Sequence, residues 1–203
     1  KVKNHNHLYE KGEVLGFDNF IIKNGVDNIS SVDKIIKGTI NEQKFYVEET
    51  VNKIKVINNE FIYNYNKNTG SFDFIQVLGE TFIDDPMKFI IWRAPTDNDR
   101  KIKNLWIEAG FNQITTRVYN SKIKEFSNRV EITSDLSLIP PYRERVLDLK
   151  VTWSIYSEGL IKCHVKGDKN MKTPYLPRFG VELKLNKSYE EVSYFGFGPY
   201  ENY

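Results

Sequence analysis

The side chains in this sequence that could do chemistry gather in two short polar stretches, one near the middle of the chain and one near its end. They are acids, an amide and arginines: Arg93, Asp97, Asn98, Asp99, Arg178 and Glu201. Carboxylates accept hydrogen bonds from hydroxyl groups, and they also form bidentate pairs with guanidinium groups. These side chains could therefore contact a hydroxyl-rich ligand, or they could hold the two stretches together as structural ion pairs.

For most of these residues we favour the structural interpretation. Arg93 could pair with a nearby acid such as Asp97 or Glu201, in an ion pair that joins the two stretches. Short polar side chains such as those of residues 97–99 cap helices and hold turns, which is how we interpret Asp97, Asn98 and Asp99. Arg178 precedes a predicted strand and Glu201 lies in a loop motif, so a structural role is favoured for both.

The elements around the first stretch can be predicted from local pattern. Residues 89–92 form a short continuous apolar run that predicts a buried strand, and Pro95 ends any pairing because it has no N–H to donate. The one clear helical pattern follows, with apolar residues at positions i, i+3, i+4 and i+7: Ile102, Leu105, Trp106 and Ala109. Gly110 stands where a left-handed C-terminal cap is expected. The polar stretch is therefore a strand-to-helix turn.

Two separated motifs carry a resemblance to a known family. The first is Trp-Arg-Ala-Pro-Thr-Asp-Asn-Asp at residues 92–99. The second is Pro-Arg-Phe-Gly at residues 177–180, followed by Phe-Gly-Phe-Gly-Pro-Tyr-Glu-Asn-Tyr at residues 195–203. In this order and at this separation they resemble the signature of the last domain of the large bacterial β-galactosidases of glycoside hydrolase family 2.

The resemblance implies where the chemistry lies. Glycoside hydrolysis needs two carboxylates on either side of a sugar-sized gap, and Asp97 and Asp99 are too close in sequence to be that pair. In the family, the catalytic acid and nucleophile belong to a barrel domain upstream, and nothing in this sequence resembles that barrel. We therefore expect no catalytic residue in this chain and no hydrolysis by the chain alone. The candidates for contact with carbohydrate are Arg93, Asp97, Asn98, Asp99, Arg178 and Glu201.

The resemblance also implies cofactors, partners and compartment. It predicts no cofactor and no metal in this chain, although full-length family members commonly use magnesium and sodium in other domains. It predicts a β-galactoside substrate, contacts with the upstream barrel and sandwich domains of the same chain, a homo-oligomer when full length, and a cytoplasmic location. His5 and His7 stand two residues apart but have no third ligand at a clear spacing, so they do not predict a metal site.

Composition agrees with an ordinary folded domain. The 203 residues are 40% hydrophobic and 28% charged, and their formal net charge of +2 gives no nucleic-acid footprint. No apolar run approaches ~20 residues, so no membrane-spanning helix is predicted. The aromatic content of 14% favours β-structure and is also compatible with sugar stacking. The single cysteine, Cys163, alternates with Ile161 and Val165 and is expected to be a small core residue.

Alternation of apolar and polar residues predicts most of the strands. A hairpin with an aromatic face is expected around the turn at residues 67–70, and further strands are expected at residues 131–138, 145–155, 160–166 and 180–185. His164 falls on a solvated face between two lysines. The fold class is therefore mostly β, a large antiparallel β-sandwich with one short helix, and the resemblance adds that this sandwich is galactose-mutarotase-like.

The domain organisation follows from the resemblance as well. Residues 1–50 are expected to be the end of an immunoglobulin-like domain and a linker, because residues 8–20 are similar to the final strands of that domain in the family. Residues 51–203 are expected to be the N-terminal part of the last, small-chain β-sandwich domain, truncated at its C-terminus and left with an unfinished sheet edge.

Three alternatives remain open. A stand-alone carbohydrate-binding module would need an exposed platform of aromatic side chains. The small subunit of a two-chain β-galactosidase would be expected to begin near Val51, so residues 1–50 favour one long chain. An epimerase would need a paired histidine and carboxylate, and His164 is the only histidine beyond residue 7.

Overall fold

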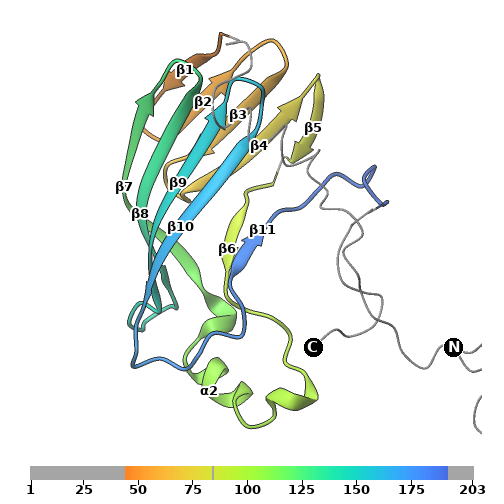
Figure 1. Ribbon diagram of the computed structural model, residues 1–203. Coiled ribbons are helices and arrows are strands. Elements are labelled where there is room, and N and C mark those ends of the chain that lie inside the picture. Colours follow the sequence, from red (N-terminus) through yellow and green to blue (C-terminus); the bar gives the residue numbers. More distant parts are fainter. Residues whose placement is uncertain (1–43, 84, 192–203) are drawn as a thin grey trace, which may run out of the picture. The chain divides into compact units, whose positions relative to one another are not determined.

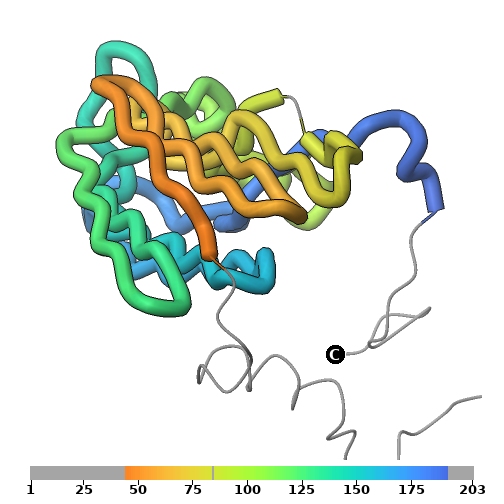
Figure 2. Tube along the Cα trace, turned by 90° about the horizontal axis from the view of Figure 1, so that it is seen from above, coloured from red at the N-terminus to blue at the C-terminus, as the bar shows by residue number. Residues whose placement is uncertain are grey.

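The computed structural model describes residues 44–83 and 85–191 of the chain. Within these residues, a pair of antiparallel sheets pack face to face, and two short strands and a helical segment lie at one end (Figure 1). Figure 2 shows the same layers from above. The prediction of a mostly β, antiparallel sandwich with one α-helix is confirmed for these residues. The described residues do not include the expected immunoglobulin-like remnant, nor do they include His5, His7 or Glu201.

The first sheet has five strands in chain order. They are β1 (Tyr46–Glu49), β2 (Lys53–Ile57), β3 (Phe61–Asn66), β4 (Ser71–Val77) and β5 (Glu80–Ile83). The predicted hairpin is β3 and β4, and Phe61, Tyr63 and Tyr65 of β3 all face the core. β1 pairs with β2 along its whole length, so residues 46–49, which the sequence assigned to a linker, form the edge strand of this sheet.

The second sheet has four strands in the order β10-β9-β8-β7. They are β7 (Thr115–Glu125), β8 (Arg129–Ile139), β9 (Leu147–Tyr156) and β10 (Ile161–Lys169). The sequence pattern located β8, β9 and β10 but missed β7. A register shift between Val118 and Asn120 of β7 breaks the period-two pattern on which such a prediction depends.

The core between the sheets is aromatic, and the polar atoms of Trp153, Tyr65 and Ser134 within it are paired. Phe72 of β4 meets Trp153 of β9 edge to face, with ring centroids 5.1 Å apart. The indole of Trp153 donates a 3.0 Å hydrogen bond to the carbonyl oxygen of Gly70. The hydroxyl of Tyr65 lies 2.6 Å from that of Ser134, which is fully buried, so these polar atoms enter the core only with partners.

A third, two-stranded sheet leads into the helical segment. It pairs β6 (Lys88–Ile90) with β11 (Gly180–Glu182). After β6 the chain forms the 3-10 helix η1 (Asp97–Asp99), the α-helix α2 (Lys103–Glu108) and the 3-10 helix η2 (Phe111–Gln113). Gly110 has φ of 74°, as the predicted left-handed cap requires.

Two predictions about burial or extent were wrong. The strand expected to run to residue 185 ends at Glu182, because its partner β6 has only three residues, and Leu183 and Leu185 are exposed. Cys163 is exposed because β10 is the edge strand of its sheet. On the apolar face of the helical pattern, Trp106 is fully buried and Leu105 is exposed.

Candidate functional site

The strand-to-helix turn between β6 and α2 is organised around one buried carboxylate. Asp99, the last residue of η1, is only 7% exposed. Both nitrogens at the end of the Arg93 guanidinium donate to it, one at 2.5 Å to Oδ2 and the other at 2.9 Å to Oδ1. This bidentate geometry is the strong form of the arginine–carboxylate pair, and it fixes both side chains in one orientation.

Thr96 supplies the other donors to this carboxylate. Its backbone N–H donates to Oδ2 of Asp99 at 2.7 Å, and its hydroxyl donates to the same oxygen at 3.0 Å. The Arg93 guanidinium, followed by the Thr96 backbone N–H, lowers the pKa of Asp99 from 3.8 to about 2. A carboxylate held ionised in this way has no proton to give at neutral pH, so Asp99 cannot act as a general acid.

Arg93 also ties the turn to the second sequence motif. Its Nε donates to the carbonyl oxygen of Pro177 at 3.2 Å, and its guanidinium lies over the Trp106 ring, 5.5 Å from the ring centroid. The Trp106 indole in turn donates to the carbonyl oxygen of Tyr175 at 2.9 Å. One guanidinium and one indole therefore join three segments of the chain: residues 92–99, α2 and residues 175–177.

The structural ion pair expected for Arg93 is present, but its acid differs from the acids named as examples. The sequence pointed to Asp97 or Glu201, whereas the partner is Asp99. The single turn of η1 brings its third residue back towards Arg93 and leaves its first two exposed. Thr96 was not predicted as a member of the site. A threonine three residues before an acid has the spacing of a capping box, and this spacing could have identified both Thr96 and Asp99.

The other candidates that the structure describes face outward. Asp97, Asn98 and Arg178 are exposed, and their side chains make no hydrogen bond or ion pair with another residue in the described ranges. Asp97 and Asn98 lie at adjacent positions on a turn that the neighbouring Arg93 and Asp99 hold in place. The site can therefore present an acceptor and an amide from a backbone that is held in place, which is useful for contact but supplies no catalytic pair.

No metal site is formed by the residues that the structure describes. They contain no group of three or more His, Cys, Asp or Glu side chains placed to hold an ion. His164 is exposed on the outer face of β10 between Lys162 and Lys166, as its position in the pattern predicted.

Comparison with known proteins decides the family. A family model described as "Beta galactosidase small chain" matches residues 57–203. The chain belongs to the β-galactosidase small-chain family. The resemblance inferred from the two motifs is thereby confirmed, and the turn at residues 92–99 and the segment at residues 175–180 both lie inside the matched region.

Curated relatives agree with this membership and show that the chain corresponds to only a fraction of each. The beta-galactosidase of Actinobacillus pleuropneumoniae is 35% identical over 198 residues, which are 97% of this chain and 19% of that protein. The beta-galactosidase of Staphylococcus xylosus is 36% identical over 163 residues, or 80% of this chain and 16% of that protein. For Clostridium acetobutylicum the identity is 29% over 205 residues, 96% of the chain and 21% of the relative. The chain spans about a fifth of the length of the relatives that it matches.

One further property of the described residues concerns membranes. None of the helices within residues 44–83 and 85–191 has the length and apolar composition needed to cross a bilayer.

Proposed function

We propose that this chain is a non-catalytic portion of a β-galactosidase that hydrolyses terminal β-D-galactosides such as lactose. In this proposal the chain supports the barrel domain that carries out the hydrolysis and helps to shape its carbohydrate site. The full-length enzyme is a member of glycoside hydrolase family 2, acts in the cytoplasm as a homo-oligomer, and binds its magnesium and sodium in other domains.

The observation that carries the proposal is the construction of the turn at residues 92–99. The buried Asp99 and the partly exposed Arg93 are paired with each other, so neither is free for catalysis. The exposed members of the turn, Asp97 and Asn98, have unused hydrogen-bonding capacity on a fixed backbone. A turn built in this way is suited to contact and positioning, where one carboxylate and one amide can bind sugar hydroxyl groups or orient a neighbouring domain.

The first test separates catalysis from support. Purified residues 1–203 are assayed with a chromogenic β-galactoside beside the full-length enzyme. We expect turnover by the full-length enzyme and none above buffer by the chain alone. Turnover by the chain that disappears in Asp97→Asn would overturn the proposal, because it would place a catalytic carboxylate in the turn.

The second test concerns the exposed pair in the full-length enzyme. Replacing both residues (Asp97→Ala with Asn98→Ala) removes one acceptor and one amide, and we expect kcat/KM to fall about tenfold, the equivalent of one good hydrogen bond. The matched control is Arg100→Gln, an exposed residue one position beyond η1. Equal kcat/KM in the double variant, the control and the wild type would show that the turn does not contribute to the carbohydrate site.

A further inference from the structure

A shallow hollow of about 450 Å³ lies beside α2, away from the Arg93–Asp99 pair. One wall is formed by the end of α2 and by η2, and the other by the loop that connects β8 to β9. The residues that matter for its chemistry are Ile107, Asn112, Gln113, Pro141, Tyr142 and Arg143. We call this hollow the α2 groove.

The floor of the α2 groove is rigid. Gly110 ends α2 in the left-handed conformation, and a Cβ built on it would lie 2.7 Å from the Cβ of Pro140. Pro140 and Phe111 are both buried. The helix end and the β8–β9 loop are therefore in direct contact beneath the groove, and the two walls keep a fixed separation.

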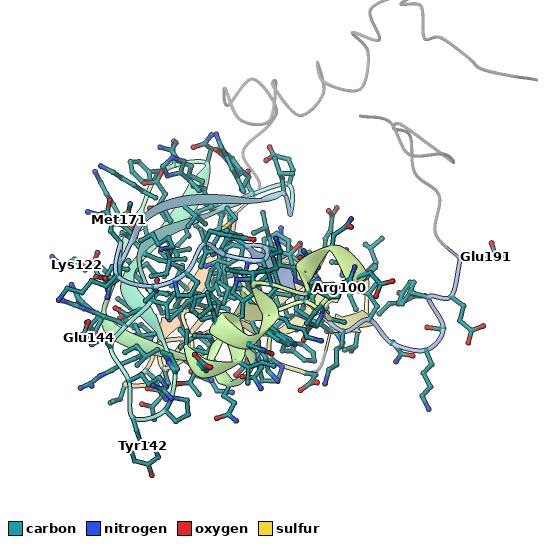
Figure 3. All side chains as sticks on the ribbon, turned by 90° about the horizontal axis from the view of Figure 1, so that it is seen from below. Arg100, Lys122, Tyr142, Glu144, Met171 and Glu191 are labelled. Atoms are coloured by element: carbon teal, nitrogen blue, oxygen red, sulfur yellow. The ribbon has the colours of Figure 1, made fainter. Side chains whose placement is uncertain are left out.

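The rim of the groove exposes apolar surface that nothing in the described chain covers. Ile107 is 49% exposed and Tyr142 is fully exposed. Figure 3 shows the Tyr142 side chain projecting away from the body of the molecule. Its backbone has φ of 57°, a conformation that costs energy for a residue other than glycine, so the exposed ring is carried by a strained position of the loop.

The chemistry of the lining matches a protein contact. Tyrosine and arginine are enriched at the centres of protein interfaces, and Tyr142 and Arg143 stand side by side on the loop. Ile107 and Pro141 offer apolar surface, while Asn112 and Gln113 can pair with backbone groups of a segment laid along the groove. A partner segment with an apolar side chain beside a carboxylate or a carbonyl group could contact the apolar residues and bind the polar ones.

We propose that the α2 groove receives a loop from the remainder of the same polypeptide, carrying an apolar side chain next to an acidic or carbonyl acceptor for Arg143. The inference rests on the proposed function for the identity of that polypeptide. Two observations select this occupant. About four-fifths of each matched relative lies outside the region aligned with this chain. The groove also adjoins α2, the same helical segment whose preceding turn presents Asp97 and Asn98.

The experiment measures thiol accessibility with and without the rest of the enzyme. Cys163, an exposed native thiol, is first replaced (Cys163→Ser). Tyr142→Cys then places a thiol on the groove rim. The control is Leu78→Cys in the turn between β4 and β5, which is also exposed and has a similar backbone φ of 50°. That turn lies at the end of the sandwich away from α2 (Figure 1). Each variant is prepared as residues 1–203 and as full-length enzyme, and its reaction with an aromatic disulfide reagent is timed.

We expect the thiol from Tyr142→Cys to react about tenfold or more slowly in the full-length enzyme than in the isolated chain, because docking removes it from solvent. The thiol from Leu78→Cys should react at the same rate in both. Equal rates at position 142 in the two preparations would overturn the proposal. Protection that appears in the isolated chain and grows with its concentration would also overturn it, because a second copy would then be the occupant. Either result is independent of the kinetic effect of Asp97 and Asn98, so the two proposals can fail separately.

Discussion

Two buried tryptophans show how differently the sandwich and the strand-to-helix turn are held together. Trp153, in the sandwich, is 3% exposed and packs among rings, with Phe72 at 5.1 Å and Phe89 at 6.3 Å between centroids. Trp106, under the strand-to-helix turn, is fully buried, yet the Arg93 guanidinium lies over its ring and the Tyr175 ring meets it at a right angle. Both indoles donate to a backbone carbonyl oxygen from a segment distant in sequence.

The difference lies in what each ring stabilises. The ring neighbours of Trp153 are apolar, so its contribution comes mainly from removing hydrocarbon from water. Trp106 is placed against a charged pair, so its burial and the Arg93–Asp99 ion pair support each other. The sandwich should therefore be insensitive to the protonation of Asp99, while the turn that presents Asp97 and Asn98 should respond to it.

The largest expected effect tests whether both rings are truly structural. Trp153→Ala and Trp106→Ala should each lower the free energy of unfolding by about 3–5 kcal/mol, as large aromatic truncations in cores do. Urea denaturation at pH 7 measures both. A loss below about 1 kcal/mol for Trp106→Ala would mean that Trp106 is not packed beneath the turn as described, and the comparison between the two tryptophans would fail.

A smaller effect is expected where the helical segment meets the β8–β9 loop. Gly110→Ala forces an alanine into the left-handed region and into Pro140, so we expect a cost of about 2–4 kcal/mol from strain and overpacking together. Gly79→Ala is the matched control, because Gly79 also has positive φ but a Cβ added to it would have no atom within 4 Å. It should cost only about 1 kcal/mol.

Thermal or urea denaturation of the two glycine variants measures how much each substitution lowers the free energy of unfolding. Equal losses for Gly110→Ala and Gly79→Ala would show that backbone strain alone matters at residue 110. The close approach of α2 to the loop, and with it the rigid floor of the α2 groove, would then be absent.

The smallest effect is a change in pH dependence. The pKa of Asp99 is lower in the folded state than its usual 3.8, so the folded chain binds fewer protons here than the unfolded chain does. The stability contributed by this carboxylate is fully present above about pH 4 and is lost as pH falls towards 2. Asp99→Asn should therefore be less stable than wild type at pH 7, and urea denaturation across the pH range should show the gap narrowing as pH falls from 4 to 2. A gap that is constant with pH would contradict the ion pair.

Much of the fold could be predicted because its strands keep a strict alternation. β3 and β9 have apolar residues at every second position facing one core, and β8 does so except at Ser134. The locations of these strands follow from that pattern alone. The helix and its glycine cap were equally visible. β7 could not be found because its register shift moves the apolar positions to the other parity half-way along the strand.

The site was harder to predict than the fold. The sequence offers Asp97, Asn98 and Asp99 side by side, and only the capping-box spacing of Thr96 and Asp99 distinguishes one of them. The three-dimensional turn shows that Asp99 is buried while the other two stay exposed. The contacts of Arg93 with Pro177 and Trp106 join residues 13 to 84 positions apart, which no local pattern encodes. The exposure of Cys163 depends on its strand lying at a sheet edge, which is likewise a property of the topology.

The central claim is that Asp99 is a structural carboxylate held by Arg93, which frees Asp97 and Asn98 for contact. The most direct test is an NMR titration of the Asp99 side-chain carboxyl carbon in the wild-type chain and in Arg93→Gln. The account predicts a pKa of about 2 for Asp99 in the wild type and a rise towards the usual 3.8 in the variant. An Asp99 pKa near 3.8 in the wild type, or a low value unchanged by Arg93→Gln, would contradict it.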